Sequence, residues 1–288
     1  MRIAIIGSGA MGRWFAGFAK RNKWDVVMTD INVAKATQTG KEIEVEVAEA
    51  NEEAVADADI ALVAVPIAET PGVVREVAKH MQKGSLLMDI ASAKGDVADE
   101  MEGLETNFEL VSLHPLFGPG ARDVKDRTFV AVPVKPGKRY TGFKRELEKL
   151  GAKVVEMEAD DHDRLMAITQ CMTHFVLMAY LSALRKMKKN VKRAEKLQTP
   201  MSSTLFSLAK AFLATNPDVM GELQVGNKYA SIARSGMLEA CRSLDVALEA
   251  RDIRVLQKVF EDARNLLGPT EARAAYEELY EEKEGEKA

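Results

Sequence analysis

Short runs of apolar residues alternate with helical patterns through the first half of the chain. Apolar residues occupy successive positions in these runs, so both faces of each strand are expected to be buried, as in a parallel sheet covered by helices. The later strands could pair in a mixed fashion. The expected strands are 2–6, 24–30, 60–65, 85–90, 110–113, 129–134 and 153–157, with helices at 10–20, 71–80 and 140–150.

The second half carries helical periodicity with few chain-breaking residues. Residues 1–150 hold 13 of the 19 glycines and 6 of the 9 prolines, and these residues punctuate short elements. The pattern predicts an α/β fold, a Rossmann-type doubly wound and mostly parallel sheet in residues 1–159, followed by an all-helical domain in 160–288. The expected helices are 161–187, 202–214, 217–250 with a break near Gly226, 253–267 and 270–282.

Composition narrows the class of protein. Lys and Arg number 40 against 44 Asp and Glu, a formal net charge of −4, which excludes a strongly basic nucleic-acid binder. Two cysteines and four scattered histidines show no disulfide framework or metal-ligand spacing. With no uninterrupted apolar stretch of about 20 residues and no signal-peptide pattern, we expect a soluble cytoplasmic protein that binds neither membrane nor nucleic acid.

A glycine motif follows the first strand and opens the first helix. In Gly7-Ser-Gly9-Ala10-Met11-Gly12, Gly7 permits the tight turn and Gly9 lets a pyrophosphate approach the backbone. Gly12 allows close packing of helix on strand. The phosphates would lie at the positive end of the helix. The order strand, glycines, helix and second strand favours a dinucleotide site over a purely structural turn.

Two further strand ends complete the expected cofactor site. Asp30 closes the second strand, where a carboxylate can accept hydrogen bonds from both ribose hydroxyls of adenosine and repel a 2′-phosphate. No arginine follows it, so NAD is favoured and NADP disfavoured. Val65 and Pro66 follow the 60–65 strand and should also border the cofactor.

Three polar residues follow strands where the cofactor crevice should lie. Ser92 and Lys94 come just after the 85–90 strand, and His114 ends the 110–113 strand before a stiff Pro- and Gly-rich turn. A rigidly mounted histidine suits acid–base chemistry. An ordinary loop histidine and a helix-capping serine would give the same residue types, and the residues alone do not decide.

A second group of polar residues lies on the first long helix. Asp163, Ala167, Gln170 and His174 have the spacing of one α-helical face among apolar neighbours. This stripe favours a polar pocket, although each residue alone could be solvated. His162 and Asp163 at the start of the helix could instead serve only in capping and dipole complementarity.

These segments resemble the prephenate dehydrogenases, especially the short archaeal type without a fused mutase domain. The resemblance rests on the glycine motif, Asp89-Ile-Ala-Ser-Ala-Lys94, Leu113-His-Pro-Leu-Phe-Gly-Pro119, Asp161-His-Asp-Arg164 and Gln170-Cys-Met-Thr-His-Phe175. It implies a Rossmann domain with a helical domain that forms a homodimer. It also implies oxidative decarboxylation of prephenate to 4-hydroxyphenylpyruvate, with hydride transfer to NAD, in tyrosine biosynthesis.

The resemblance also implies roles for the site residues. His114 would be the catalytic base that takes the proton of the ring hydroxyl. Ser92 would lie beside it and orient both the histidine and the nicotinamide. Lys94 would be a nearby cation of the substrate site. His174 would line the substrate pocket, supported by Asp163 and Gln170.

One departure leaves substrate detail open. Many members of the family carry an arginine that grips a substrate carboxylate, and 199–204 contains none. Lys94, Lys228, Arg234 or a partner-subunit residue could replace it, and no residue decides between prephenate and arogenate. The alternatives are a β-hydroxyacid-type dehydrogenase or imine reductase, and a non-catalytic dinucleotide sensor.

Overall fold

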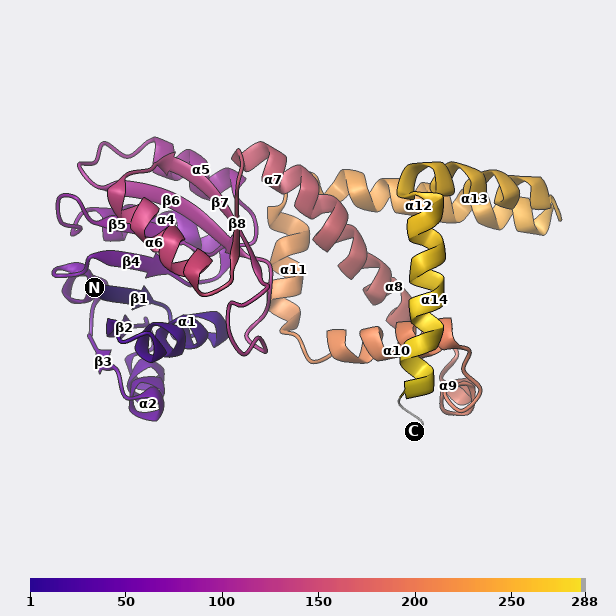
Figure 1. The fold of residues 1–288 in the computed structure, drawn as a ribbon, viewed down its shortest axis with the longest axis horizontal. Coiled ribbons are helices and arrows are strands. Elements are labelled where there is room, and N and C mark those ends of the chain that lie inside the picture. Colours follow the sequence, from indigo (N-terminus) through magenta and orange to yellow (C-terminus); the bar gives the residue numbers. More distant parts are fainter. Residues whose placement is uncertain (286–288) are drawn as a thin grey trace. The chain divides into compact units, whose positions relative to one another are not determined.

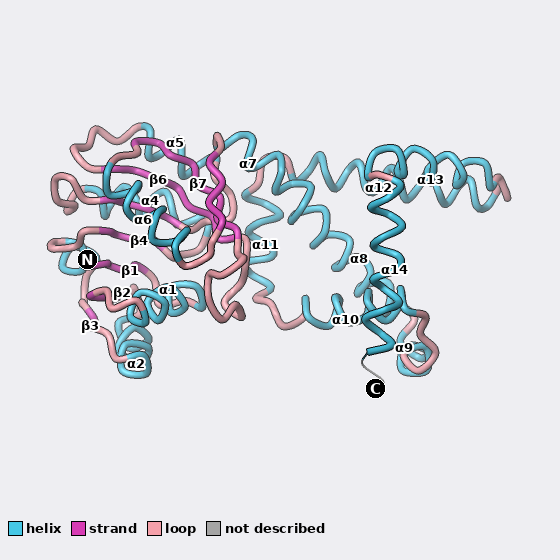
Figure 2. Tube along the Cα trace, viewed as in Figure 1, coloured by secondary structure: helices cyan, strands magenta, loops and turns pink. Residues whose placement is uncertain are grey.

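The structure, a computed structural model, describes residues 1–285, and the chain divides into two compact units. The first comprises 1–167 together with 221–229, and the second comprises 168–220 together with the described residues from 230 onward. Figure 1 follows the chain through both units, and Figure 2 separates helix, strand and loop.

The first unit is built on one eight-stranded sheet in the order β3-β2-β1-β4-β5-β6-β7-β8. All neighbouring strands are parallel except the antiparallel pair β6 and β7. The expected mostly parallel, mixed sheet is therefore confirmed. The strands are β1 (Arg2–Ile6), β2 (Asp25–Thr29), β3 (Glu46–Val47), β4 (Ile60–Val63), β5 (Leu86–Asp89), β6 (Glu109–Pro115), β7 (Thr128–Lys135) and β8 (Lys153–Glu156).

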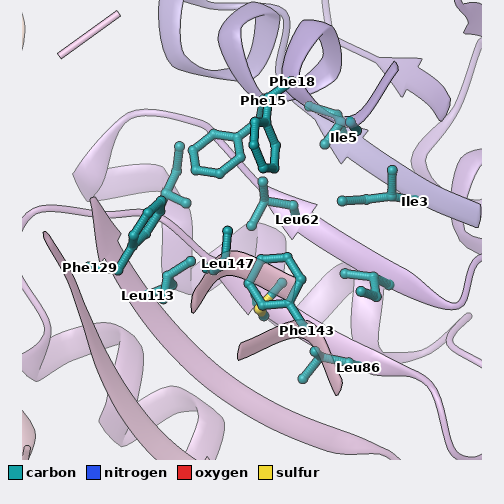
Figure 3. Close-up of a cluster of buried hydrophobic side chains, with 14 of the residues drawn as sticks. Ile3, Ile5, Phe15, Phe18, Leu62, Leu86, Leu113, Phe129, Phe143 and Leu147 are labelled. Carbon is teal, nitrogen blue, oxygen red and sulfur yellow. The ribbon is translucent and has the colours of Figure 1, made fainter. Parts of the chain in front are cut away.

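Helices cover both faces of the sheet, which makes it doubly wound. Ile3 and Ile5 pack with side chains of α1 and α6 on one face, whereas Ala4 and Ile6 pack with α3, α4 and α5 on the other. Figure 3 shows side chains of the first cluster converging from strands and helices. The helices are α1 (Ala10–Arg21), α2 (Val33–Ile43), α3 (Asn51–Val55), α4 (Thr70–Ala78), α5 (Gly95–Glu102), α6 (Lys138–Lys149) and α7 (Ala159–Met166), with a 3-10 turn at Ile67–Glu69.

The second unit is helical. Its helices are α8 (Thr173–Lys186), α9 (Lys188–Ala194), α10 (Pro200–Phe212), α12 (Ala230–Glu249), α13 (Ile253–Leu267) and α14 (Pro269–Gly285). Thr199 caps α10 through a reciprocal pair of hydrogen bonds with Ser202. The predicted break near Gly226 is present, because α11 (Pro217–Gly226) ends there.

A π-helical segment, Ala167–Met172, joins α7 to α8. Short π segments are uncommon and frequently lie at functional sites. This segment interrupts the α-helical spacing on which the expected face of Asp163, Ala167, Gln170 and His174 rested. Its wider turn changes the angular positions of the residues after it, so the single-face prediction does not hold.

The compact units also differ from the expected boundary between residues 159 and 160. The first unit continues to Ala167 and takes in 221–229. Hydrogen bonds explain this, since Asn227 donates to the Asp163 carbonyl and the Tyr229 hydroxyl bonds the Asp160 carboxylate. Sequence periodicity marks where a helix begins but not which core it packs against.

The continuous helix Ala159–Lys186 is long and apolar enough, by length and composition, to cross a membrane. Within the described residues it is the one helix that meets this criterion. A core helix of a soluble protein passes the same test, so one such helix is weak evidence for a membrane span.

Candidate active site

The glycine motif forms a tight turn between β1 and α1. Gly7 has a φ of +105°, and a Cβ there would lie 2.4 Å from the Ala64 carbonyl oxygen. A Cβ at Gly12 would lie 1.9 Å from the Gly7 carbonyl oxygen. Both positions therefore require glycine. Gly9 differs, because no atom outside its immediate chain neighbours lies within 4 Å of its notional Cβ. This side, beside half-buried Met11 and exposed Ala10, is open.

Asp30 lies at the end of β2 and contacts the glycine turn directly. Its Oδ2 accepts hydrogen bonds from the Ser8 amide at 2.6 Å and the Ser8 hydroxyl at 2.7 Å. Its Oδ1 accepts from the Asn32 amide at 2.9 Å. Burial acts to raise the pKa of Asp30, but these hydrogen bonds outweigh it and lower the pKa. The carboxylate is therefore ionised and oriented by the turn.

The loop after β4 is the second wall expected for the cofactor. Val65 is half-buried and Pro66 is exposed. The Pro66 carbonyl accepts hydrogen bonds from the Thr70 amide and hydroxyl. The Ile67 amide donates to Glu222 at 2.8 Å. The loop is thus held from both sides.

His114 lies near the end of β6 and is 2% exposed. Its Nδ1 lies 2.8 Å from Nε2 of His162, and Nδ1 of His162 lies 2.8 Å from Oδ1 of Asp163. All three side chains are buried. The structure thus brings β6 and α7 together in a continuous chain of three titratable groups.

Asp163 also caps a helix that is distant in sequence. Its Oδ1 accepts from the Lys94 amide and its Oδ2 from the Gly95 amide, both at 2.9 Å, at the start of α5. Burial acts to raise the pKa of Asp163, but hydrogen bonds from His162 and the two amides lower it overall. Asp163 is therefore a buried anion with its orientation fixed by the backbone.

Both histidines are neutral near pH 7. Burial, with a smaller effect of His162 and Lys94, lowers the pKa of His114 well below 6.5. Burial also lowers the pKa of His162, although the hydrogen bond with Asp163 acts in the opposite direction. A neutral imidazole can accept a proton, which is the state that a general base requires.

Lys94 occupies a different environment from the one expected of a substrate-binding cation. Its side chain is fully buried, and its Nζ donates to Oδ1 of Asp89 at 2.9 Å and to the Leu113 carbonyl at 2.8 Å. These partners make Lys94 an anchor of the backbone beside His114. Asp163, which was expected to support the substrate pocket, is also buried, at 1% exposed.

Ser92 is half-buried in the loop between β5 and α5. The sequence places it two residues before Lys94, on the segment that Asp89 and Asp163 hold in place. The Ala91 amide donates to Asp89 Oδ1 at 2.8 Å. Ser92 is therefore mounted on a loop whose backbone is fixed on both sides.

Gln170 and His174 belong to the second unit. Both are half-buried, and the His174 ring packs on Phe212 with centroids 5.4 Å apart. Burial lowers the pKa of His174. Within the described residues its Nδ1 is buried with no hydrogen-bond partner, and such an atom is costly unless a ligand or water satisfies it.

A cluster of charged residues surrounds Asp160 at the start of α7. Lys228 Nζ lies 2.7 Å and Arg164 Nε 2.8 Å from its carboxylate oxygens, and the Arg164 guanidinium lies 4.4 Å from the centre of the Tyr229 ring. Lys228, one of the cations considered for a substrate carboxylate, is therefore exposed and paired. Within the part of the chain that the structure describes, no group of three or more His, Cys, Asp or Glu residues could hold a metal ion.

His162 is the site residue that sequence reasoning missed. Its position at a helix start gave it only a capping role. The available signal was the His-Asp pair next to an otherwise apolar helix, because a buried pair of this kind requires a partner. The partner is His114, 48 residues away in the chain, and periodicity cannot reveal such a contact.

Two family models match the chain in succession. The prephenate dehydrogenase nucleotide-binding domain matches residues 15–156, and the prephenate dehydrogenase dimerization domain matches residues 158–262. The chain belongs to the prephenate dehydrogenase family. This membership supports the expected nucleotide-binding domain followed by a helical domain.

Relatives of known name leave the substrate open. A probable arogenate/prephenate dehydrogenase of Methanocaldococcus jannaschii is 29% identical over 96% of this chain and 63% of its own length; this chain thus spans less than two thirds of that relative. A 4-amino-4-deoxyprephenate dehydrogenase of Streptomyces pristinaespiralis is 28% identical over 92% of this chain and 90% of its own.

A solved structure supports the fold. The prephenate dehydrogenase of A. aeolicus, in complex with hydroxyphenyl propionate and NAD+, superposes with a TM-score of 0.72 at 19% identity. The match covers 92% of this chain and 98% of that chain. The Rossmann-type sheet followed by a helical region is therefore the architecture of the family.

Proposed function

We propose that this protein catalyses the NAD-dependent oxidative decarboxylation of prephenate to 4-hydroxyphenylpyruvate, with His114 as the general base. The observation that carries the proposal is the neutral, buried His114 at the end of β6, held by His162 and Asp163. Family membership supplies the reaction class, and the relatives' names supply the candidate substrates, prephenate, arogenate and 4-amino-4-deoxyprephenate.

In the proposed reaction the protein itself moves one proton, that of the substrate's ring hydroxyl. His114 accepts the proton of the ring hydroxyl as the carbon that bears it loses hydride and becomes a carbonyl. Bound NAD supplies the hydride acceptor. Loss of carbon dioxide from the opposite ring carbon then leaves its electron pair in the ring, which becomes a phenol on protonation of the oxygen. The protein contributes position and a neutral base.

We assign the cofactor as NAD from the glycine turn and Asp30. The open side of Gly9 and the N-terminus of α1 fit a pyrophosphate. The ionised Asp30 carboxylate suits a ribose with two hydroxyls and opposes a 2′-phosphate. Gly7, Gly12, Ala10, Met11, Val65 and Pro66 would form the remaining cofactor surface.

We further propose roles for three residues that contact substrate or cofactor. Ser92 would orient both the nicotinamide and His114. His174, whose Nδ1 lacks a partner within the described residues, would bond a polar group of the substrate, and Gln170 would lie in the same pocket. We also propose that the helical domain forms a homodimer, which is consistent with the name of the second family model. We propose tyrosine biosynthesis as the pathway and the cytoplasm as the location.

The test is a direct assay of the purified protein. NAD or NADP is mixed with prephenate, arogenate or 4-amino-4-deoxyprephenate, and formation of the reduced cofactor is followed by absorbance. We expect NAD with prephenate to give the highest kcat/KM. The proposal would be wrong if the protein binds NAD but reduces it with none of the three substrates. That result would favour the non-catalytic dinucleotide sensor.

His114→Asn tests the assigned base. We expect kcat to fall by about 10²–10⁴-fold, the usual contribution of general base catalysis, while the Kd for NAD stays unchanged. His80→Asn is the matched control, because His80 follows α4 and lies 3.7 Å from Glu52 at the surface. Near-normal turnover by His114→Asn would show that His114 is not the general base.

A further inference from the structure

We infer that His162 and Asp163 act together as a positioning relay, which holds the proton of His114 on Nδ1 and so presents Nε2 as the basic nitrogen. The inference rests on the proposed function, because it explains how His114 is set to accept the substrate's proton. His162 and Asp163 contact neither substrate nor cofactor in this role. They act through His114.

The direction of the relay follows from its fixed end. Asp163 is an ionised carboxylate and can only accept hydrogen bonds, and the amides of Lys94 and Gly95 hold both of its oxygens. The nitrogen of His162 that faces it, Nδ1, must therefore carry a proton. In a neutral imidazole the other nitrogen, Nε2, then carries the lone pair.

The lone pair of His162 in turn fixes His114. Nε2 of His162 lies 2.8 Å from Nδ1 of His114, so His114 must donate from Nδ1 to it. The lone pair of His114 is thus placed on Nε2. The two rings meet at 67° with their centroids 5.0 Å apart, an edge contact that suits this hydrogen bond rather than stacking.

Asp163 supplies the buried anion of the relay. Burial and the nearby Lys94 lower the pKa of His114, so a proton on His114 needs a compensating charge. The ionised Asp163 provides it through His162. His162 accepts from the resulting imidazolium through Nε2, while Asp163 stabilises the charge from the far side, as the carboxylate of a Ser-His-Asp triad does for its histidine.

Lys94 holds the backbone at both ends of the relay. Lys94 donates through Nζ to the Leu113 carbonyl, next to His114, and through its amide to Asp163. One residue thus ties both ends of the relay together. Asn227 adds a further anchor by donating to the Asp163 carbonyl at 2.8 Å.

Three variants separate a relay from a structural role. In His162→Leu no acceptor faces His114, and we expect kcat to fall by about 10²–10³-fold, between the cost of a supporting residue and that of a triad carboxylate. KM for prephenate and the Kd for NAD should change little. His162→Gln places an amide oxygen near the position of Nε2 and should recover at least tenfold of this loss.

Asp163→Asn should remove the charge of the relay and keep its tautomers. The atom that faces His162 also accepts from the Lys94 amide, so the amide oxygen of asparagine takes that position and still accepts from Nδ1 of His162. The imidazolium of His114 then lacks the buried anion, and we expect kcat to fall by about 10–100-fold, as for loss of a supporting carboxylate. His80→Asn is again the control and should leave kcat unchanged.

Nitrogen NMR of protein labelled with ¹⁵N-histidine measures the tautomer directly. The chain has only four histidines, and His114→Asn and His162→Gln assign the two that matter. We expect neutral His114 and His162 to be protonated on Nδ1 in the wild-type protein near pH 7. A His114 proton on Nε2, or kcat unchanged in His162→Leu, would overturn the relay.

The two proposals fail separately. The NMR experiment needs no substrate, so it decides the tautomer even if the protein turns over none of the three candidates. Turnover by the wild-type protein with no effect of His162→Leu would reject the relay and leave the proposed function intact. If His162→Leu does not fold, His162→Gln and the wild-type spectrum still decide the question.

Discussion

The ammonium of Lys94 and the carboxylate of Asp89 form an ion pair of 2.9 Å in which both side chains are 0% exposed. A buried pair contributes little net stability compared with an apolar pair of similar shape, but removal of one partner leaves an uncompensated charge. Because Lys94 also bonds the Leu113 carbonyl beside His114, this ion pair links the stability of the sheet to the geometry of the site.

Lys94→Met should therefore destabilise the protein strongly. We expect the free energy of unfolding to fall by about 3–5 kcal/mol, since the Asp89 carboxylate remains buried without its cation. Chemical unfolding measures this loss. Lys149→Met removes an exposed pair with Glu146 and should change the same quantity by less than about 1 kcal/mol. Equal losses of stability in Lys94→Met and Lys149→Met would contradict the expected cost of leaving the Asp89 carboxylate buried without its cation.

Stability should depend on pH through the buried histidines. Burial lowers the pKa values of His114, His162 and His174 in the folded protein. Below about pH 6.5 the unfolded chain binds protons that the folded protein does not, so the free energy of unfolding should fall as the pH drops. Each such proton contributes up to about 1.4 kcal/mol per pH unit.

Unfolding curves at pH 7.5, 6.5 and 5.5 measure this effect. The loss should be confined to the interval below pH 6.5, and His114→Asn should reduce its slope. Asp30 and Asp163 have lowered pKa values, so their contribution is lost only at more acidic pH. A flat profile between pH 6.5 and 5.5 would argue that these histidines titrate normally.

Asp30→Ser should weaken NAD binding and relax discrimination against NADP. The change removes the carboxylate expected to hold the ribose hydroxyls and the charge that opposes a 2′-phosphate. We expect the Kd for NAD to rise about tenfold, the value of one good charge-assisted hydrogen bond, and the NADP-to-NAD ratio to rise. Isothermal titration measures both.

Asp25→Ser is the matched control for Asp30→Ser. Asp25 begins the same strand that Asp30 follows, and it is exposed and paired with Arg2. Its loss should leave both affinities unchanged. An unaltered Kd for NAD in Asp30→Ser would reject the proposed ribose contact.

Gly12→Ala should damage the cofactor turn because its Cβ would collide with the Gly7 carbonyl oxygen. We expect a loss of about 1–3 kcal/mol in stability, typical of overpacking, together with weaker NAD binding. Gly142→Ala provides the contrast, since no protein atom lies within 4 Å of its notional Cβ in α6. There alanine should stabilise the helix by about 0.5–1 kcal/mol. Thermal unfolding of both variants measures the difference.

Much of the first unit could be predicted from local patterns. Seven of the eight strands, and the helices between them, follow from runs of apolar residues, because a strand buried on both faces must be apolar along its length. The edge strand β8 carries such a run although it is mostly exposed. β3, with two residues, carries too short a pattern to detect. The glycine positions were also predictable, since the turn between β1 and α1 leaves no space for a side chain at Gly7 or Gly12.

The sequence by itself determined the fold class, the glycine turn between the first strand and the first helix, and the position of His114 at a strand end, because each depends on neighbours in the chain. Only the tertiary structure decided that Lys94 is buried against Asp89 and that His162 contacts His114. It also decided that Asp163 caps α5. The contacts of His162 and Asp163 join segments far apart in sequence, and Lys94 meets Asp89 only because the loop after β5 folds back into the buried interior. Packing between elements, not periodicity within one, determines whether a charged side chain meets solvent or a partner.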